Sequence, residues 1–395
     1  MNFVFISPNF PENYYHFCAE LKNNGVNVLG IGDCPYDDLK PELRDALAEY
    51  YKVSSLENYD EVYRAVAFFA FKHGRIDWLE SNNEYWLERD AKLRDDFNIN
   101  TGFHSVDMTK SKYKSAMKAY YKKAGIPAAR YHLVDTLENG KAFAAEVGYP
   151  VIVKPDNGVG ASDTHKLHDE QELEAFYADK HDEQYIMEEC VKGVVCSYDA
   201  IINSKGEPIF ESGNVSAMSI MDIVNNNDNS FFYMVKDLAP DLREAGRACI
   251  KAFDVKSRFV HWEFFRLQED QEGLGKAGQI VGLEVNMRPS GGVSPDMHNF
   301  ANSTNVYKIW ADMIVKDYTD LPQGQHYYCG FGSRRFGRDF IYSHEEIMAK
   351  YGHVICMEGP VPEALSGAMG NYMYLGRFNE EAEMFDFIRE LFATR

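Results

Sequence analysis

The stretch Leu283–Gly292, LEVNMRPSGG, decides the fold and the chemistry that we expect of this chain. On an extended strand, side chains two apart share a face, so Glu284, Asn286 and Arg288 point the same way. Two oxygen ligands and one cation therefore project together from the predicted strand. The stretch consequently predicts one half of a metal and phosphate site.

An apolar run upstream predicts the other half of that site. Phe259–Leu267 is typical of a strand and carries Glu263 on one face. The polar, Gly-rich link Gln268–Gly278 predicts an antiparallel hairpin with Ile280–Met287, which would bring Glu263 near Glu284. Two carboxylates and an amide oxygen suit Mg²⁺, which keeps its remaining positions for water and phosphate. The alternative is a hairpin with charged residues on a solvated face.

Length and charge limit the function classes. A chain of 395 residues is expected to form two or three packed units. Its 45 % hydrophobic and 14 % aromatic residues suffice for real cores. The formal charge of −20, from 41 basic and 61 acidic residues, argues against nucleic acid as a partner, because phosphate-backbone binding needs dense Lys and Arg.

Cysteine spacing and hydropathy point to a cytoplasmic protein. The 7 cysteines are scattered without CxxC spacing, so neither a disulfide framework nor a zinc site is predicted. The amino terminus does not look like a signal peptide, and no apolar run approaches the roughly 18 residues that span a bilayer. We therefore expect no membrane partner.

The order of predicted elements indicates a mixed α/β and α+β architecture. The first hundred or so residues alternate strands and helices, as in a small parallel α/β layer. They lack GxGxxG, which disfavours a dinucleotide site. A Lys-rich helix is predicted over Ser111–Ala124, and a helix opened by Pro240 over residues 240–253. Mixed strands and helices follow from about residue 327.

A glycine-containing turn follows the predicted strand that begins at Val151 and carries Lys154. Glycine lets the backbone approach an anion closely, and successive N–H groups can bind phosphate oxygens. Lys154 adds a point charge suited to phosphate. The Walker spacing is absent, and a purely structural turn remains the alternative. The turn residues proposed to contact phosphate are Gly158, Gly160, Ala161 and Ser162.

These motifs, in this order, resemble the ATP-grasp superfamily over roughly residues 1–315. The resemblance implies an amino-terminal parallel α/β domain, here residues 1–108, followed by two ATP-grasp subdomains, residues 109–190 and 191–320. The subdomains would clamp ATP between them, and the second would carry the metal site. Residues 321–395 are expected to form a carboxy-terminal α/β extension.

The resemblance also implies roles for individual residues. Lys114, in KSAMKAYYKKAGIP, and Lys154 would contact the nucleotide phosphates, and the turn after Lys154 would form a flexible lid. In the hinge YIMEECVKG, Glu188 would bind the exocyclic amine of adenine. The backbone of Glu189, Cys190 and Val191 would bind the ring edge. Of the four lysines in the stretch KSAMKAYYKK, only Lys114 is expected to contribute to the site.

For the catalytic end, the resemblance implies Glu263, Glu284 and Asn286 as ligands of Mg²⁺, with Mn²⁺ as an alternative metal. Arg288 would steady the transferring phosphoryl group and the substrate carboxylate, and Ser290 and Gly291 would contact substrate. His261 shares the face of Glu263 and is expected to be a hydrogen-bonded, neutral histidine.

The implied activity is that of an ATP-dependent carboxylate–amine ligase. It would activate a small carboxylate as an acyl phosphate, join it to an amine, and release ADP and phosphate. A homo-oligomer is left open. One alternative is a bicarbonate-activating carboxylase resembling biotin carboxylase, because a helix follows Ala239-Pro240. The other is a non-catalytic ATP-binding protein, because Val195 stands where the family usually has a ribose-binding Glu. A milder departure is Tyr113, where the family commonly has Asp.

Overall fold

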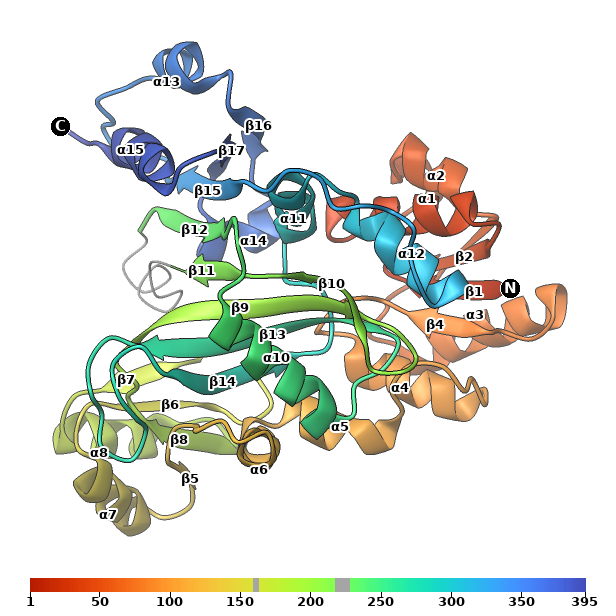
Figure 1. The fold of residues 1–395 in the computed structure, drawn as a ribbon. Helices are drawn as coiled ribbons and strands as arrows, with labels where there is room; N and C mark the ends of the chain where they lie inside the picture. The colour runs from red at the N-terminus through yellow and green to blue at the C-terminus, as the bar shows by residue number, and fades with distance from the viewer. Residues whose placement is uncertain (159–162, 217–227) are drawn as a thin grey trace.

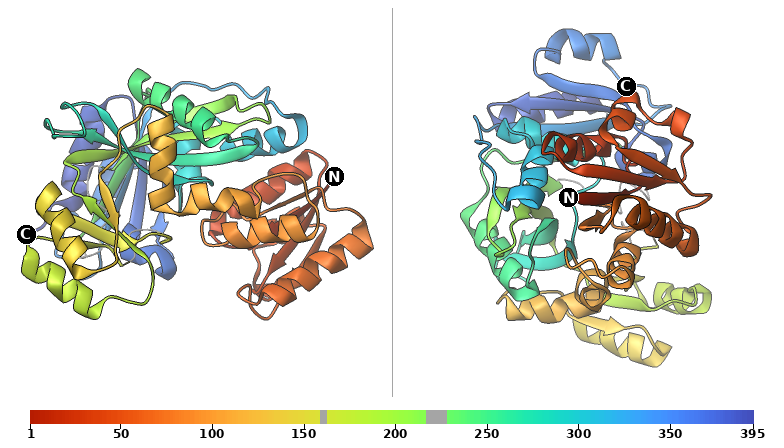
Figure 2. Two further views of the ribbon diagram at one scale, coloured as in Figure 1. Left: turned by 90° about the horizontal axis from the view of Figure 1, so that it is seen from below. Right: turned by 90° about the vertical axis from the view of Figure 1, so that its right-hand side faces the viewer.

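The computed structural model describes residues 1–158, 163–216 and 228–395, and these residues form three β-sheets with helices packed on them (Figure 1). A long central sheet lies between a small amino-terminal α/β unit and a second small sheet. Two further views show the amino-terminal unit, in red, well apart from the yellow-green unit around residues 130–190 (Figure 2). None of the helices in these ranges is long and apolar enough to cross a membrane.

The amino-terminal sheet is parallel throughout, with the strand order β3-β2-β1-β4. Its central strand is buried on both faces, because Val4 packs with one layer of helices and Phe3 and Phe5 with the other. The predicted parallel α/β layer is therefore confirmed. The elements are β1 Asn2–Ile6, η1 Glu12–Tyr14, α1 Tyr15–Asn23, β2 Asn27–Gly32, η2 Tyr36–Asp38, α2 Pro41–Ala46, β3 Glu49–Lys52, α3 Tyr59–His73, β4 Trp78–Glu80 and α4 Leu87–Asp96.

The predicted Lys-rich helix begins later than expected. Helix α5 spans Ser105–Lys112, the backbone is extended at Tyr113, and α6 spans Lys114–Lys123, so a helix running through from Ser111 is wrong. The break has a tertiary cause. The Lys114 N–H donates to the Asp156 carbonyl at 3.0 Å, and the Ser115 N–H donates to the Asp156 carboxylate at 2.8 Å. Asp156, the residue that follows strand β6 (Val151–Pro155), therefore caps α6 and sets where it begins.

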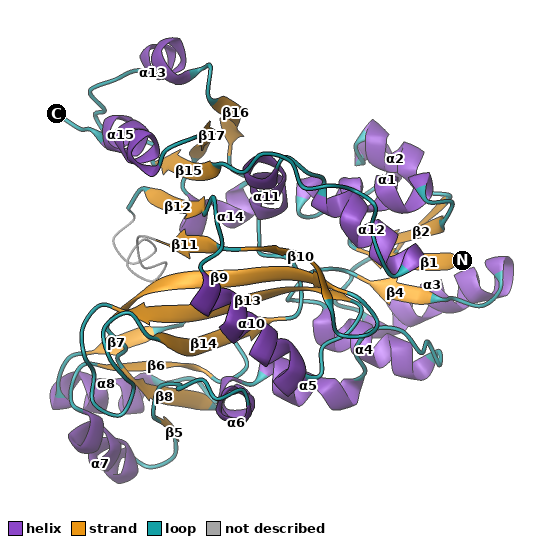
Figure 3. Cartoon of the chain, viewed as in Figure 1, coloured by secondary structure: helices purple, strands orange, loops and turns teal. Residues whose placement is uncertain are grey.

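The second sheet has the strand order β5-β8-β6-β7, and its pairings are antiparallel. Figure 3 shows α7 and α8 together beside this sheet. Val153 and Met187 pack into the core under these helices, whereas Lys154 and Glu188, one residue further along each strand, face the other way. The elements are β5 Tyr131–Leu133, α7 Leu137–Val147, β6 Val151–Pro155, β7 His165–Leu167, α8 Glu170–Asp179 and β8 Tyr185–Glu189.

The central sheet has the strand order β14-β13-β9-β11-β12-β15-β17-β16, with β10 paired to β9. The predicted hairpin is confirmed, because β13 and β14 pair antiparallel. The carboxy-terminal strands extend this same sheet. The elements are β9 Gly193–Ile202, β10 Pro208–Ser212, β11 Asn214–Ser216, β12 Ser230–Met234, α10 Pro240–Phe253, β13 Arg258–Leu267, β14 Ile280–Asn286, α11 Ser294–Asn302, α12 Val306–Lys316, β15 Tyr328–Arg334, α13 His344–Tyr351, β16 Ile355–Pro360, α14 Glu363–Met369, β17 Tyr372–Phe378 and α15 Glu381–Phe392.

A buried ion cluster joins the amino-terminal unit to the central sheet. The Glu80 carboxylate, at the end of β4, accepts from Arg94 of α4 at 2.9 Å and from Arg258 of β13 at 2.5 Å. Burial alone would raise the pKa of Glu80, but Arg258 and Arg94 outweigh it and hold the pKa below its ordinary value. The Arg258 guanidinium also donates to the Met287 carbonyl at 2.7 Å. This cluster therefore fixes the β4 loop against the end of β14.

Asp90 beside this cluster generates a stability prediction. It accepts from the Ser81 N–H and hydroxyl, and burial together with the Glu80 charge raises its pKa from 3.8 to about 7. Because the pKa is raised, Asp90 is protonated in the folded state and ionised in the unfolded state between pH 3.8 and about 7. The Asp90 contribution to stability is therefore full below pH 3.8 and is lost as the pH rises to about 7.

The Asp90→Asn variant removes this titration. Its free energy of unfolding, relative to that of the unsubstituted protein, should therefore rise across the same pH window. Urea unfolding at a series of pH values measures the difference between the two proteins. A difference that stays constant with pH would contradict the prediction.

Candidate nucleotide and metal site

Two buried lysines pair with one buried glutamate between the second sheet and α6. Lys154 lies 2.6 Å from Glu188, and Lys118 of α6 pairs with the other oxygen of the same carboxylate. Burial opposes the charge on Glu188, yet the two lysines lower its pKa to about 2. Lys114, one turn before Lys118, is also buried. The arrangement concentrates positive charge where the predicted phosphate contacts lie.

Lys118 was not predicted from the sequence as a buried residue. It is buried and paired with Glu188, so its side chain is not solvated, and it lies on the same helix as the predicted Lys114. Its pKa is lowered by burial, which outweighs the raising effect of Glu188. The i, i+4 spacing from Lys114 places both side chains on one helix face, and that spacing is the signal that could have found it.

Lys114 connects the phosphate turn with the predicted metal strands. Its ammonium group donates to the Gly158 carbonyl at 3.0 Å and lies 3.3 Å from the Glu284 carboxylate. The structure therefore brings the predicted lysine, turn and carboxylate to one point. The predicted turn residues Gly160, Ala161 and Ser162 lie outside the described residues.

The predicted metal ligands come from facing positions of β13 and β14. Glu263 lies directly opposite Glu284, and Asn286 lies opposite His261. Burial lowers the pKa of Lys154, but Glu188, Glu284 and Glu263 together raise it above its ordinary value, so these groups share one electrostatic environment. In the described parts of the chain, no three His, Cys, Asp or Glu side chains form a metal cluster. The donor set of two carboxylates and an amide oxygen nevertheless fits Mg²⁺.

A charged histidine lies beside Glu263. His261 Nδ1 lies 2.8 Å from the fully buried Asp199 carboxylate, and Nε2 lies 3.5 Å from Glu263. Burial lowers the pKa of His261, but Asp199 and Glu263 raise it to about 9. The predicted hydrogen bond of His261 is present, and its two carboxylate neighbours favour the protonated ring over the neutral one.

Arg288 lies at the end of the site and is held by three oxygen atoms. Its guanidinium donates to Asn286 Oδ1 at 3.0 Å and to the Pro289 carbonyl at 2.9 Å, and its Nε lies 3.3 Å from Glu84. Glu84 follows β4 and also pairs with Lys112 at 3.0 Å. Glu84 could not be predicted from the sequence, because its contact with Arg288 joins positions that are distant in sequence.

The residues after Arg288 meet the amino-terminal unit. The Asn13 side chain donates to the Gly292 carbonyl at 3.1 Å and to the Asp296 carboxylate at 2.8 Å. Ser290 is buried, and its hydroxyl has no hydrogen-bond partner among the described residues. A Cβ atom at Gly291 would meet nothing within 4 Å. Of the two predicted substrate residues beside Arg288, Gly291 therefore has open space next to it, whereas Ser290 is enclosed.

The predicted adenine hinge is held by neighbours from two other loops. The Glu189 carboxylate accepts from the Arg130 N–H at 2.7 Å and from the Arg130 guanidinium at 2.8 Å. The Cys190 carbonyl accepts from Gln271 at 3.0 Å, and Val191 packs on the small core beneath the β13–β14 connection. Val195, where the family has its ribose acceptor, is an apolar residue paired with Phe265.

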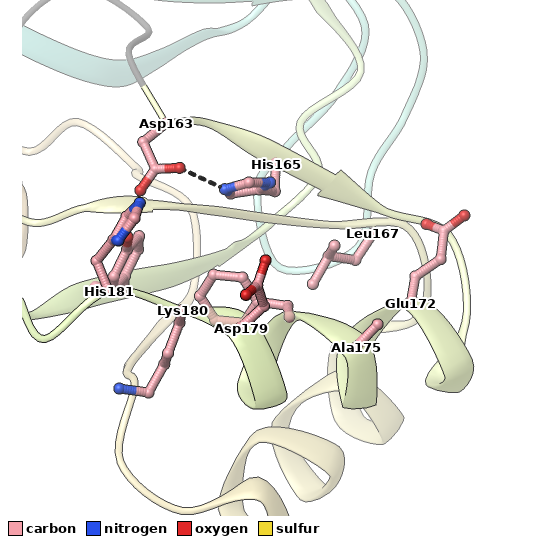
Figure 4. A pocket seen from close by; sticks show the side chains of 10 residues that line it. Asp163, His165, Leu167, Glu172, Ala175, Asp179, Lys180 and His181 are labelled. Atoms are coloured by element: carbon pink, nitrogen blue, oxygen red, sulfur yellow. Dashed lines mark hydrogen bonds and ion pairs between the residues drawn. The ribbon is translucent and has the colours of Figure 1, made fainter.

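A separate cavity lies at β7, α8 and β8 (Figure 4). Asp163 accepts from His165 at 2.7 Å and from the Tyr185 hydroxyl, and Glu172 lines the cavity at its other end. Tyr185 and Glu188 lie three residues apart on β8, so they point to opposite faces of the sheet. This cavity is therefore on the helix-covered face and is distinct from the lysine site.

Comparisons with known proteins agree with this arrangement. Residues 110–191 match the family described as carbamoyl-phosphate synthase L chain, ATP binding domain. The L-arginine-specific L-amino acid ligase of Bacillus subtilis is 25 % identical over 304 residues, which are 74 % of this chain and 70 % of that protein.

Solved structures resemble the whole chain. The L-amino acid ligase from Bacillus licheniformis has a TM-score of 0.72 at 16 % identity, covering 99 % of this chain and 96 % of that one. The biotin carboxylase domain of the Hydrogenobacter thermophilus 2-oxoglutarate carboxylase, in complex with MgADP, ADP and bicarbonate, has a TM-score of 0.69 at 14 % identity. This match covers 98 % of this chain and 88 % of that one.

In its fold and in the segment that matches the ATP-binding domain, the chain is similar to ATP-grasp proteins. The predicted resemblance is thereby confirmed, and so is the predicted fold class. Among its relatives, those that resemble it over most of both chains include L-amino acid ligases.

Lys118 provides a test of the lysine cluster. The Lys118→Met variant should weaken ATP binding by about tenfold, because it removes one buried cation and loosens Glu188, and a charge-assisted hydrogen bond contributes roughly 1.5–3 kcal/mol. Calorimetric titration of ATP measures the dissociation constant. The matched control is Lys122→Met, an exposed lysine on the same helix, which should bind ATP normally. Equal dissociation constants for the two variants would remove Lys118 from the site.

Proposed function

We propose that this protein is an ATP-dependent ligase that activates a carboxylate as an acyl phosphate and joins it to an amine, releasing ADP and phosphate. The single observation that carries the proposal is the convergence of Lys114 and Lys154 with the facing carboxylates Glu263 and Glu284. Cations for a triphosphate and oxygens for a divalent metal lie together at the junction of two sheets. The likeness to L-amino acid ligases supports the same reaction.

ATP would lie between the second sheet and the central sheet. Lys114, Lys118 and Lys154 supply cations for its phosphates, and the turn at Gly158 supplies backbone groups beside them. The hinge at residues 189–191 would hold adenine.

The division into residues 1–108, 109–190, 191–320 and 321–395 is our proposed domain description. We also propose that the protein is cytoplasmic and that it forms a homo-oligomer.

Glu263, Glu284 and Asn286 would hold Mg²⁺, or Mn²⁺ in its place. Their oxygens are of the hard type that this ion prefers, and Lys114 and His261 already neutralise part of their charge. When bound, the ion supplies charge neutralisation between the nucleotide phosphates. A structural neighbour in complex with MgADP is consistent with this assignment.

The residues around Arg288 would align the substrate carboxylate that accepts the phosphoryl group from ATP. Phosphoryl transfer depends mainly on positioning the reactants and compensating their charge. Arg288 would supply both, and its guanidinium is itself held in place by Asn286 and Glu84. The Ser290 hydroxyl and the backbone N–H groups of Ser290 and Gly291 are suited to an oxyanion on the acyl carbon. Burial of this segment against the amino-terminal unit limits access of water to the acyl phosphate.

We further propose that the substrate whose carboxylate is activated is an amino acid, because the relatives that match most of this chain are named L-amino acid ligases. Two alternatives follow from particular observations. The likeness to a biotin carboxylase domain with bound bicarbonate favours a bicarbonate-activating carboxylase. The missing ribose acceptor at Val195 favours a non-catalytic ATP-binding protein.

One screen separates these functions. The protein is incubated with ATP and Mg²⁺ and with amino acids, alone and in pairs, and ADP release is measured. A ligase should release ADP only when a carboxylate and an amine are both supplied, and mass spectrometry should find the amide product. ADP release with bicarbonate alone would favour the carboxylase. Tight ATP binding without ADP release in every mixture would leave the non-catalytic protein.

The Glu284→Gln variant tests the metal assignment. It should reduce turnover by roughly two orders of magnitude or more, the size seen when a preorganised charge-stabilising group is removed, while ATP binding is retained in part. Steady-state ADP release and calorimetric titration of ATP provide the two readouts. Glu272→Gln, an exposed glutamate in the β13–β14 connection, is the matched control and should be active. Near-normal turnover of Glu284→Gln would exclude Glu284 as a metal ligand.

A further inference from the structure

The amino-terminal sheet has a topological switch point that faces Arg288. The chain passes from β1 to β2 on one side and later returns to place β4 on the other side of β1. In open parallel sheets, ligands bind in the crevice at the carboxyl ends of the strands at such a point. Here the two loops at that point are residues 7–11 after β1 and residues 81–86 after β4. Glu84, in the second loop, reaches Arg288.

Glu84 is a buried carboxylate that is only partly satisfied. Its side chain is 9 % exposed, and Oε1 accepts from Lys112 at 3.0 Å. Oε2 lies 3.3 Å from Arg288 Nε but has no hydrogen bond of good geometry to any described residue. A buried charged oxygen without a full set of hydrogen bonds is costly. The unfilled hydrogen-bonding position at Oε2 therefore marks a place for a hydrogen-bond donor.

Further unpartnered polar atoms belong to the same loops. The side-chain nitrogen of Asn82 and the hydroxyl of Ser290 are buried and lack hydrogen-bond partners in the described ranges. The Tyr14 hydroxyl donates to the Asn82 carbonyl at 2.8 Å, and the charges of Glu84 and Arg288 both act on Tyr14. Buried polar atoms of the loop after β4 and of the segment after β14 therefore lie close in sequence to Glu84 and Arg288, and Tyr14 of η1 contacts the first of these segments.

We propose that Glu84 binds the α-ammonium group of an amino acid whose carboxylate is bound by Arg288. In an α-amino acid the two charged groups are attached to one carbon atom, so the receptor must offer a cation and an anion in contact with each other. The 3.3 Å pair of Arg288 and Glu84 has this property. This inference rests on the proposed ligase function and names its specificity-determining residue for the carboxylate donor.

Glu84 suits a zwitterion better than a simple carboxylic acid. A carboxylate alone would need only Arg288 and Lys112, and the negative charge of Glu84 between them would weaken its binding. With an amino acid, the ammonium group takes the vacant hydrogen-bonding position at Oε2, while the carboxylate pairs with the guanidinium. The same pair therefore discriminates against bicarbonate and against acids without an amino group.

Matched substrate pairs test this assignment. ADP release is measured for L-alanine and propanoate, L-leucine and 4-methylpentanoate, and L-phenylalanine and 3-phenylpropanoate, each with excess amine acceptor. The unsubstituted protein should favour the amino acid in kcat/KM by at least about 100-fold, because a site built to hydrogen-bond an NH group rejects an analogue that lacks it. In Glu84→Gln, that preference should fall by at least about tenfold, with the ATP dissociation constant unchanged.

The controls separate recognition from support of the fold. Glu42→Gln removes an exposed glutamate from α2 of the same unit and should keep the full preference. If Glu84 only positions Arg288, Glu84→Gln will slow both members of each pair equally, and that result overturns the proposal. If Glu84→Gln does not fold, Glu84→Asp, which keeps the charge on a shorter side chain, should lower the preference by a smaller factor. An unchanged preference in Glu84→Asp would overturn the proposal.

Two results in the unsubstituted protein distinguish the proposals from each other. ADP release that is equal for amino acids and their deaminated partners overturns the role of Glu84 while the ligase function stands. No ADP release with any acid and amine overturns the ligase function itself, and the assignment of Glu84 with it.

Discussion

The antiparallel register of β13 and β14 places Glu263 directly opposite Glu284, and the rest of the site is arranged around that pair. Two facing carboxylates repel each other unless cations compensate them. Compensation comes from three directions: Lys114 from α6, His261 from the same strand, and Lys154 across the junction between the sheets. The need to neutralise this pair explains why so many buried charges meet where two separately built sheets approach.

Buried charge also links the units of the fold. Glu80 joins Arg94 of the amino-terminal unit to Arg258 of β13, and Glu84 joins Lys112 to Arg288. Breaking one partner of such a pair leaves an uncompensated buried charge, so these contacts restrict how the amino-terminal unit can shift against the central sheet. The carboxyl end of β4 is thereby held against the end of β14.

Several features of the site could be predicted from the sequence because they depend on local periodicity. The alternation in LEVNMR and the polar link before it were enough to predict the hairpin, and the Gly and Pro signals were enough to predict the helix Pro240–Phe253. The elements around Lys118 and Tyr113 were not predicted correctly. Lys118 lies in a run of lysines that reads as solvated, and only Glu188, 70 residues later in the chain, explains its burial. The break at Tyr113 depends on Asp156 in the same way.

The sequence by itself determined the β13–β14 hairpin, the helix Pro240–Phe253 and the spacing of Glu284 and Asn286 along β14, because each of these follows from residues within a few positions of one another. Only the tertiary structure decided which charges are compensated: that Glu188 pairs with two lysines, that His261 is charged beside Asp199, and that Glu84 reaches Arg288. The physical reason is that the cost of burying a charge depends on the partners that folding brings to it, and those partners come from distant parts of the chain.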